Sequence, residues 1–214
     1  LVLGLLACNM TSPAEAIHEE AAAPACGTLY GHSVLVPSDH RGSSMDLLCR
    51  RRSFGTEVRE LSALLLSLEE ALFLQSELHV LDVRTQSTVH TSDTLFLKCC
   101  ELVREFPSRY LAYRHYRLQG WTVCPDSLKF GADFLLYDGR PDEVHADYAL
   151  ILTTECLQWK DVVMASRLAQ LVAKELLLVA TNASSSAEAK LAEFLASSTP
   201  VLEFATRPWR RHLS

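Results

Sequence analysis

Tyr137, His145 and Lys174 are the residues of this sequence whose types and spacing could support proton transfer. A phenol and an imidazole can each carry a proton, and histidine side chains titrate near neutral pH. A lysine ammonium can stabilise a negative charge that develops during a reaction. Each residue alone is weak evidence, because such tyrosines are usually core residues and such histidines and lysines are usually solvated. Together, on three neighbouring elements, they suggest a site for acid–base chemistry.

The sequence around Tyr137 and His145 predicts two strands joined by a turn. Residues 130–137 have the aromatic and aliphatic content of a strand, 138–141 form an Asp-Gly-Arg-Pro turn signal, and 146–153 resume an apolar run. The first strand should end at Tyr137, and His145 should open the second. We therefore expect the phenol and the imidazole at the same end of a sheet, where α/β folds usually place their chemistry.

Lys174 is predicted to lie on the helix that follows these strands, from about Asp161 onward. Arg167 and Lys174 are seven positions apart, so they should share one face of this helix, roughly 10 Å apart along its axis. On that geometry Arg167 points into the same cleft as Lys174. A buried strand over Leu176–Ala180 should follow.

The composition is that of a globular protein with weak general affinity for nucleic acid. The chain has 214 residues, of which 49% are hydrophobic and 21% are charged, and its formal net charge is −6. Nucleic-acid binders normally carry a basic surface, so much of any affinity for RNA should come from partner chains. The seven cysteines show no CxxC pair and no zinc-like spacing with histidine, which favours free thiols in a reducing compartment. No metal or cofactor is expected.

The chain is predicted to form two domains after a tail. Residues 1–25 should be a loose tail, 26–106 an α+β domain, and 107–214 an α/β domain with a mixed sheet flanked by helices. The opening run Leu1–Cys8 lacks a basic flank and is far shorter than the roughly 20 apolar residues of a membrane span. We interpret it as a truncated end, and expect a soluble protein without membrane insertion.

Two helices are predicted in the first domain, after a short β segment. Ser67-Leu68-Glu69-Glu70 is a capping box at the start of the first helix. The apolar residues that follow it at helical spacing extend as far as Leu81. The second helix should cover Thr94–Glu105.

A further helix is predicted from Pro107 to Gly120, and it mixes tyrosines with arginines. Such a helix could stack on nucleic acid, but more often its rings pack on a sheet while its arginines extend to the solvent. Asp133, on a central strand, is interpreted as structural. Metal-dependent nucleases also carry an aspartate there, but they need a Glu-x-Lys arrangement after a strand, which this sequence lacks.

These residues resemble a known family. The sequence at 128–150, LKFGADFLLYDGRPDEVHADYAL, is preceded by YLAYRHYRLQGW and followed by SRLAQLVAKELLLV. Together they resemble the catalytic domain of tRNA-splicing endonucleases, above all the eukaryotic catalytic subunit that cuts the 5′ splice site. The resemblance implies a restriction-endonuclease-like fold for residues 107–214 and an assembly role for 26–106. It also implies a hetero-oligomer, most simply a heterotetramer, that acts on intron-containing pre-tRNA.

The resemblance also implies roles for five residues. The family keeps the spacings Tyr137–His145 and Arg167–Lys174, with tyrosine as general base, histidine as general acid and lysine as a fixed cation. Its reaction is metal-independent attack by the 2′-hydroxyl, which gives a 2′,3′-cyclic phosphate and a 5′-hydroxyl. We expect Lys174 and His145 to lower the pKa of Tyr137; a positioning role for Tyr137 stays open. Arg167 and Trp209 would clamp a flipped intron base, although Pro208 precedes Trp209 where the family places its proline later.

Three other functions stay open at this stage. The chain could be the subunit that cuts the 3′ site, a non-catalytic structural subunit of the same complex, or a homo-oligomeric enzyme. Trp159-Lys160-Asp161 and the YRHYRLQGW helix favour the 5′ subunit over the 3′ one, and the intact Tyr, His and Lys favour a catalytic chain. A nuclear location is expected, with the cytosol, including an organelle surface, as the alternative.

Overall fold

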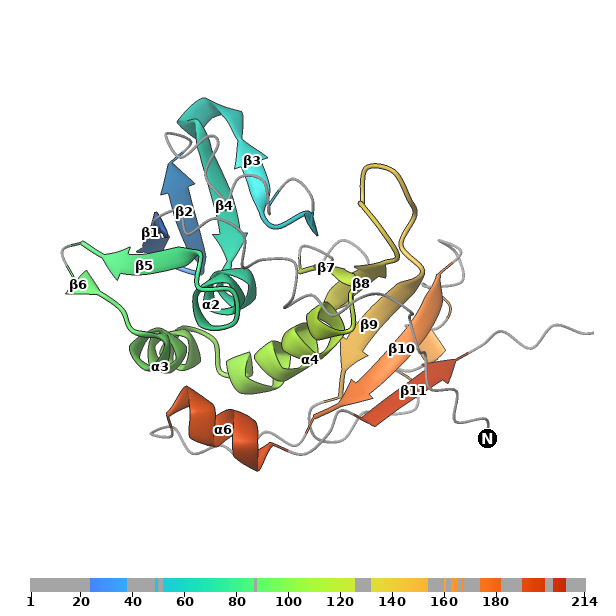
Figure 1. Ribbon diagram of the computed structural model, residues 1–214. Helices are drawn as coiled ribbons and strands as arrows, with labels where there is room; N and C mark the ends of the chain where they lie inside the picture. Colours follow the sequence, from blue (N-terminus) through green and yellow to red (C-terminus); the bar gives the residue numbers. More distant parts are fainter. Residues whose placement is uncertain are drawn as a thin grey trace, which may run out of the picture.

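A computed structural model describes residues 24–37, 49, 52–86, 88–125, 132–153, 160, 163, 164, 167, 174–181, 190–198 and 202–206. These residues form two sheets, with helices α2 (Leu68–Ser76) and α4 (Phe106–Leu118) between them (Figure 1). Helix α2 contacts the first sheet, α4 contacts the second, and the two helices contact each other.

The first sheet has six strands in the order β3-β4-β2-β1-β5-β6. Its strands are β1 (Ala25–Tyr30), β2 (Ser33–Pro37), β3 (Thr56–Val58), β4 (Ala63–Ser67), β5 (Leu81–Thr85) and β6 (Thr88–Val89). A short 3₁₀ helix, η2 (Arg59–Leu61), joins β3 to β4, and helix α3 (Ser92–Leu102) follows β6. Strand β5 pairs in parallel with β1, and the other pairs of this sheet are antiparallel.

The predicted capping box starts helix α2. The backbone amide of Glu70 donates to Ser67 Oγ at 3.2 Å, and the amide of Ser67 donates to Glu70 Oε2 at 2.9 Å. The predicted extension of this helix to Leu81 is wrong. Helix α2 ends at Ser76, and the chain turns through His79, whose φ is 54°, before Leu81 opens β5. The apolar spacing that suggests a helix extends past the turn because Leu81 is also buried, but it is buried as a residue of β5.

The second sheet has five strands in the order β11-β10-β9-β8-β7. Its strands are β7 (Thr122–Cys124), β8 (Phe134–Tyr137), β9 (Tyr148–Leu152), β10 (Glu175–Ala180) and β11 (Leu202–Thr206), and helix α6 (Leu191–Ser197) lies between β10 and β11 in the chain. Strand β9 pairs in parallel with β10, whereas the other neighbours are antiparallel. This mixed sheet with flanking helices confirms the α/β class predicted for this part of the chain; the domain limits stay a prediction.

One continuous core joins the two sheets through α4. Tyr110, Tyr113 and Tyr116 of α4 are almost fully buried and pack with side chains of both sheets. The helix therefore packs its rings on the sheet, as the structural interpretation predicted. Its arginines do not all extend to the solvent: Arg117 is only 5% exposed, because it donates hydrogen bonds to groups inside the core. The rings serve packing within this fold.

Among the described residues, Cys26, Cys49, Cys99, Cys100 and Cys124 carry free thiols. Burial raises the pKa of the Cys100 thiol to about 11, so this thiol is a poor nucleophile at neutral pH. Within the described parts of the chain, none of the helices has the length and apolar content needed to span a bilayer.

Candidate active site

The backbone places Tyr137, His145 and Lys174 at the same end of the second sheet. Tyr137 is the last residue of β8, which runs antiparallel to β9. The amide of Asp147 donates to the carbonyl oxygen of Leu136 at 2.9 Å, so this end of β8 meets the start of β9, two residues after His145. The carbonyl oxygen of Asp147 in turn accepts the amide of Glu175 at 3.0 Å, which brings Lys174 alongside the same end.

A loop with a hydrogen-bonded turn at 140–144 carries the chain from Tyr137 to His145. Gly139 has a φ of 132°, a backbone conformation that residues other than glycine rarely adopt. The carbonyl oxygen of Arg140 accepts the amides of Glu143 at 2.9 Å and Val144 at 3.0 Å. His145 follows this turn and is exposed, so its imidazole is accessible to a bound substrate.

Tyr137 belongs to the face of the sheet that lies away from α4. Phe134 and Leu136 point into the main core, whereas Leu135 and Tyr137 contact a second, smaller cluster, as strand alternation requires. Burial raises the pKa of the Tyr137 phenol, and the Cys124 thiol adds to this rise. The expectation that nearby cations lower the pKa of Tyr137 is therefore wrong for the chain without substrate. Desolvation of the half-buried ring is the main cause of the rise.

Lys174 is not helical, which corrects the helix predicted for it. The residue has no helical or strand structure and lies directly before β10, because Glu175 already pairs with β9. Lys174 therefore does not share a helix face with Arg167. Arg167 itself is helical and exposed, and Trp209 lies outside the described residues. The structure thus brings Tyr137, His145 and Lys174 to one sheet end, while the clamp of Arg167 and Trp209 stays a prediction.

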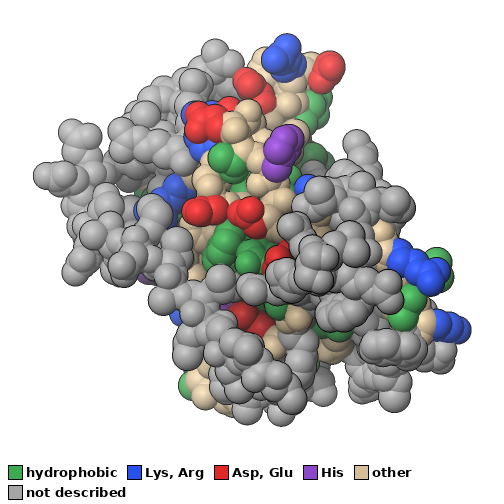
Figure 2. Space-filling model, turned by 90° about the vertical axis from the view of Figure 1, so that its right-hand side faces the viewer, with side chains coloured by type: hydrophobic (Ala, Val, Ile, Leu, Met, Phe, Trp, Pro, Cys, Tyr) green, Lys and Arg blue, Asp and Glu red, His purple; other side chains and the backbone are tan. Residues whose placement is uncertain are grey.

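The face around the β8–β9 turn is acidic in its described part. Seen from the side on which this turn lies in Figure 1, acidic side chains gather in the middle of the molecule, with a histidine beside them (Figure 2). Asp138, Asp142, Glu143 and Asp147 near this turn are exposed, and Arg140 forms ion pairs with two of them, Asp142 and Glu143. No group of three or more metal-binding side chains occurs in the part of the chain that the structure describes.

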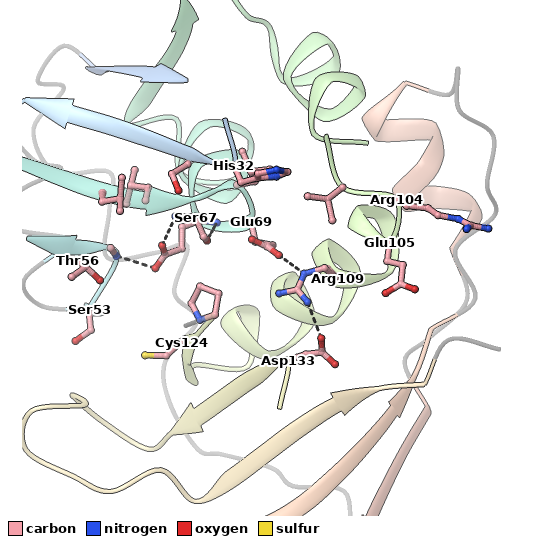
Figure 3. A pocket seen from close by; sticks show the side chains of 18 residues that line it. His32, Ser53, Thr56, Ser67, Glu69, Arg104, Glu105, Arg109, Cys124 and Asp133 are labelled. Atoms are coloured by element: carbon pink, nitrogen blue, oxygen red, sulfur yellow. Dashed lines mark hydrogen bonds and ion pairs between the residues drawn. The ribbon is translucent and has the colours of Figure 1, made fainter. Parts of the chain in front are cut away.

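A separate cavity of about 670 Å³ lies between the two sheets and is lined by Glu69, Arg109 and Asp133, among other residues. Figure 3 shows the three side chains in a row, with Arg109 between the two carboxylates. Sequence reasoning assigned Asp133 correctly to a structural role, but it missed Glu69 and Arg109. Their pairing spans 40 positions, and no local spacing indicates it.

Comparison with known proteins identifies the family. A family profile described as tRNA intron endonuclease, catalytic C-terminal domain, matches residues 106–188, a range that contains all three clustered residues. A tRNA-splicing endonuclease of Methanococcus maripaludis is 31% identical over 124 residues, which cover 56% of this chain and 70% of that protein. The chain belongs to the tRNA intron endonuclease family. The resemblance found in the sequence is thus confirmed at the level of the family.

Eukaryotic tRNA-splicing endonuclease subunits are also similar to this chain. The tRNA-splicing endonuclease subunit Sen2 of Rattus norvegicus is 32% identical over 152 residues, which cover 66% of this chain and 32% of that subunit. The chicken subunit Sen2 is 39% identical over 105 residues, covering 49% of this chain and 22% of the subunit. The chain therefore spans about a third or less of the length of these two relatives.

Proposed function

We propose that this chain is a catalytic subunit of a tRNA-splicing endonuclease that cleaves pre-tRNA at the 5′ splice site. The observation that carries the proposal is the strand pairing that brings Tyr137, His145 and Lys174 to one sheet end, within the part that matches the catalytic domain of the family. Two proton-carrying groups and a cation are the set that cleavage through a 2′-hydroxyl requires.

In the proposed reaction, the 2′-oxygen next to the scissile phosphate forms a bond to phosphorus as the bond to the 5′-oxygen breaks. The products are a 2′,3′-cyclic phosphate and a 5′-hydroxyl, and no water is consumed. His145 donates the proton that the leaving 5′-oxygen takes up. Lys174 stabilises the extra negative charge on the phosphate oxygens as the fifth bond forms.

Tyr137 has a constrained part in this scheme. Its pKa is raised by burial and by Cys124, so at neutral pH nearly all of the phenol keeps its proton. Only the small ionised fraction can take the proton of the 2′-hydroxyl. We therefore assign two functions to Tyr137: the phenol orients the 2′-hydroxyl by hydrogen bonding, and its ionised form is the base.

The acidic surroundings of the site favour a hetero-oligomer. A formal charge of −6 and exposed carboxylates beside His145 repel RNA phosphates, so partner subunits supply most of the basic surface that holds the substrate. Arg167 and Trp209 clamp an unpaired base in this proposal, because guanidinium and indole faces both stack on bases. Nuclear location, where pre-tRNA is produced, belongs to the same proposal.

A cleavage assay with the native complex tests the proposal. The tagged full-length chain is purified with the subunits that accompany it and is incubated with an intron-containing pre-tRNA labelled at either end. His145→Ala in this chain should slow the cut at the 5′ junction by roughly 10²–10⁴ and leave the rate of the cut at the 3′ junction unchanged. Loss of the 3′ cut instead would assign the chain to the other catalytic subunit, and no effect at either junction would make it non-catalytic.

A further inference from the structure

Arg109 joins the first sheet's helix to strand β8 of the candidate active site. Its Nε donates to Glu69 Oε1 of α2 at 2.7 Å, and its Nη1 donates to Asp133 Oδ1 at 2.8 Å (Figure 3). The guanidinium also lies 4.9 Å from the ring centroid of Phe134, the first residue of β8. The Arg109 side chain is 21% exposed and that of Glu69 is 8% exposed, so both groups have lost much of their hydration and depend on each other.

Asp133 continues this connection into the β8–β9 pair. Its second oxygen, Oδ2, accepts the amide of Leu152 at 2.8 Å, and its own amide donates to the carbonyl oxygen of Leu150 at 2.8 Å. Leu152 is the last residue of β9. The carboxylate therefore adds a side-chain hydrogen bond between β9 and the residue directly before β8, at the end of these strands opposite to Tyr137 and His145.

The hydrogen bond from the Leu152 amide to Asp133 is important because β8 is short. The strand has four residues, and its described pairs with β9 are Phe134–Leu150, Leu135–Ala149 and Leu136–Tyr148. A shift of one residue in this pairing would turn every side chain of β8 to the opposite face. Tyr137 would then leave the face away from α4, and its phenol would lose its place at the sheet end.

We propose that Arg109 is a positioning residue for the cleavage reaction. Its ion pairs with Glu69 of α2 and with Asp133 keep Asp133 in place, where Asp133 bonds to the end of β9. This contact fixes the register of β8 relative to β9, and the register sets the position of Tyr137 relative to His145. The packing of the assembly part of the chain is thereby coupled to the geometry of the active site. This inference rests on the proposed function and adds a residue about which the catalytic spacing gives no information.

The chain offers a matched control on the same two helices. Arg114 of α4 donates from Nε to Glu77 Oε1 at 2.7 Å and from Nη2 to Glu77 Oε2 at 3.2 Å. Glu77 caps the other end of α2. Arg114→Gln therefore removes an ion pair that joins only α4 and α2 among the described residues, whereas Arg109→Gln removes one that continues to Asp133, directly before β8.

Two measurements on the native complex test the inference. Arg109→Gln should lower the single-turnover rate at saturating pre-tRNA by roughly 10- to 100-fold, the scale expected for a small misplacement of reacting groups. The pre-tRNA concentration that gives half of the maximal rate should change little. Hydrogen exchange should show faster exchange of the Asp147 and Leu152 amides. Arg114→Gln should change neither. Asp133→Asn keeps an acceptor for the Leu152 amide but loses the ion pair with Arg109. This variant should also have a lower cleavage rate, while its Leu152 amide stays protected from exchange.

The outcomes separate this inference from the proposed function. Equal rates for Arg109→Gln and Arg114→Gln, compared at equal folded fraction, would overturn the inference, as would unchanged exchange of Asp147 and Leu152 in Arg109→Gln. A wild-type complex that does not cleave pre-tRNA would overturn the proposed function. In that case the exchange data alone decide whether Arg109 fixes the β8–β9 register.

Discussion

Arg117 Nη2 donates to the carbonyl oxygen of Val123 at 3.0 Å, and Val123 lies on β7, an edge strand of the second sheet. The same guanidinium donates from Nη1 to the carbonyl oxygen of Arg52 at 2.9 Å and from Nη2 to that of Ser53 at 3.3 Å. Its carbon lies 4.1 Å from the ring centroid of Phe54. One buried cation thus fastens a loop of the first sheet to the edge of the second.

Arg117→Met should strongly destabilise the fold, because three carbonyl oxygens lose their hydrogen-bond donor and the buried Glu70 carboxylate, 4.0 Å from Arg117 Nη2, loses its cationic partner. Removal of one member of a buried charged network typically costs about 3–5 kcal/mol. The melting temperature should fall by roughly 6–20 °C for a chain of this size. Arg114→Met breaks a more exposed ion pair and should cost much less. Similar melting temperatures for the two variants would show that Arg117 does not hold the two sheets together.

His145→Ala should lower the cleavage rate of the assembled complex by roughly 10²–10⁴, the scale for loss of a general acid. RNA affinity and melting temperature should change little, because His145 is exposed after a turn. His32→Ala, which changes an exposed histidine in the turn between β1 and β2, is the control and should keep the wild-type rate. Wild-type cleavage by His145→Ala would place the acid elsewhere.

The residual activity of His145→Ala should depend on pH through Tyr137 alone. The base is active when deprotonated, so below its pKa the active fraction grows with pH. Because burial and Cys124 raise the pKa of Tyr137, the rate should rise about tenfold per pH unit from roughly pH 6 to 9 without a plateau. The single-turnover rate is measured across this range, with His145→Ala/Tyr137→Phe as the baseline for hydroxide. Identical slopes in both variants would leave Tyr137 with the positioning function only.

Trp209→Ala should weaken RNA binding or slow cleavage by roughly 5- to 150-fold, since stacking on a base is worth about 1–3 kcal/mol. Trp209→Phe should recover much of this loss, because it keeps an aromatic face. Arg167→Ala should lower binding in the same direction without loss of stability, because Arg167 is exposed. A large fall in the melting temperature of Trp209→Ala, with cleavage by the folded fraction intact, would assign Trp209 to the core.

Local patterns were sufficient to predict several elements of this fold. The capping box at Ser67 is a contact across three residues, so its signal lies within one short segment. The helix predicted from Pro107 to Gly120 corresponds to α4, and the strand predicted at Leu176–Ala180 corresponds to β10. A strand, a turn and a second strand place Tyr137 and His145 at the same end of the sheet, and β8 and β9 have this antiparallel arrangement.

Long-range pairing accounts for what the sequence did not reveal. Strand β5 pairs in parallel with β1 across more than fifty positions, and the leucine-rich β4 could be read as helix or strand. The helix expected at Lys174 fails because pairing of Glu175 with β9 starts a strand there. The ion pairs of Arg109 join α4 to residues far before and after it, and no local pattern contains them.

Cleavage of an intron-containing pre-tRNA by the native complex in excess EDTA tests the central claim most directly. The substrate carries either an unmodified 5′ junction or a single 2′-deoxy substitution at the scissile position. We predict full cleavage without metal, 2′,3′-cyclic phosphate and 5′-hydroxyl ends, and no cut in the 2′-deoxy substrate. Loss of cleavage on chelation, with 3′-hydroxyl ends in the presence of metal, would contradict it.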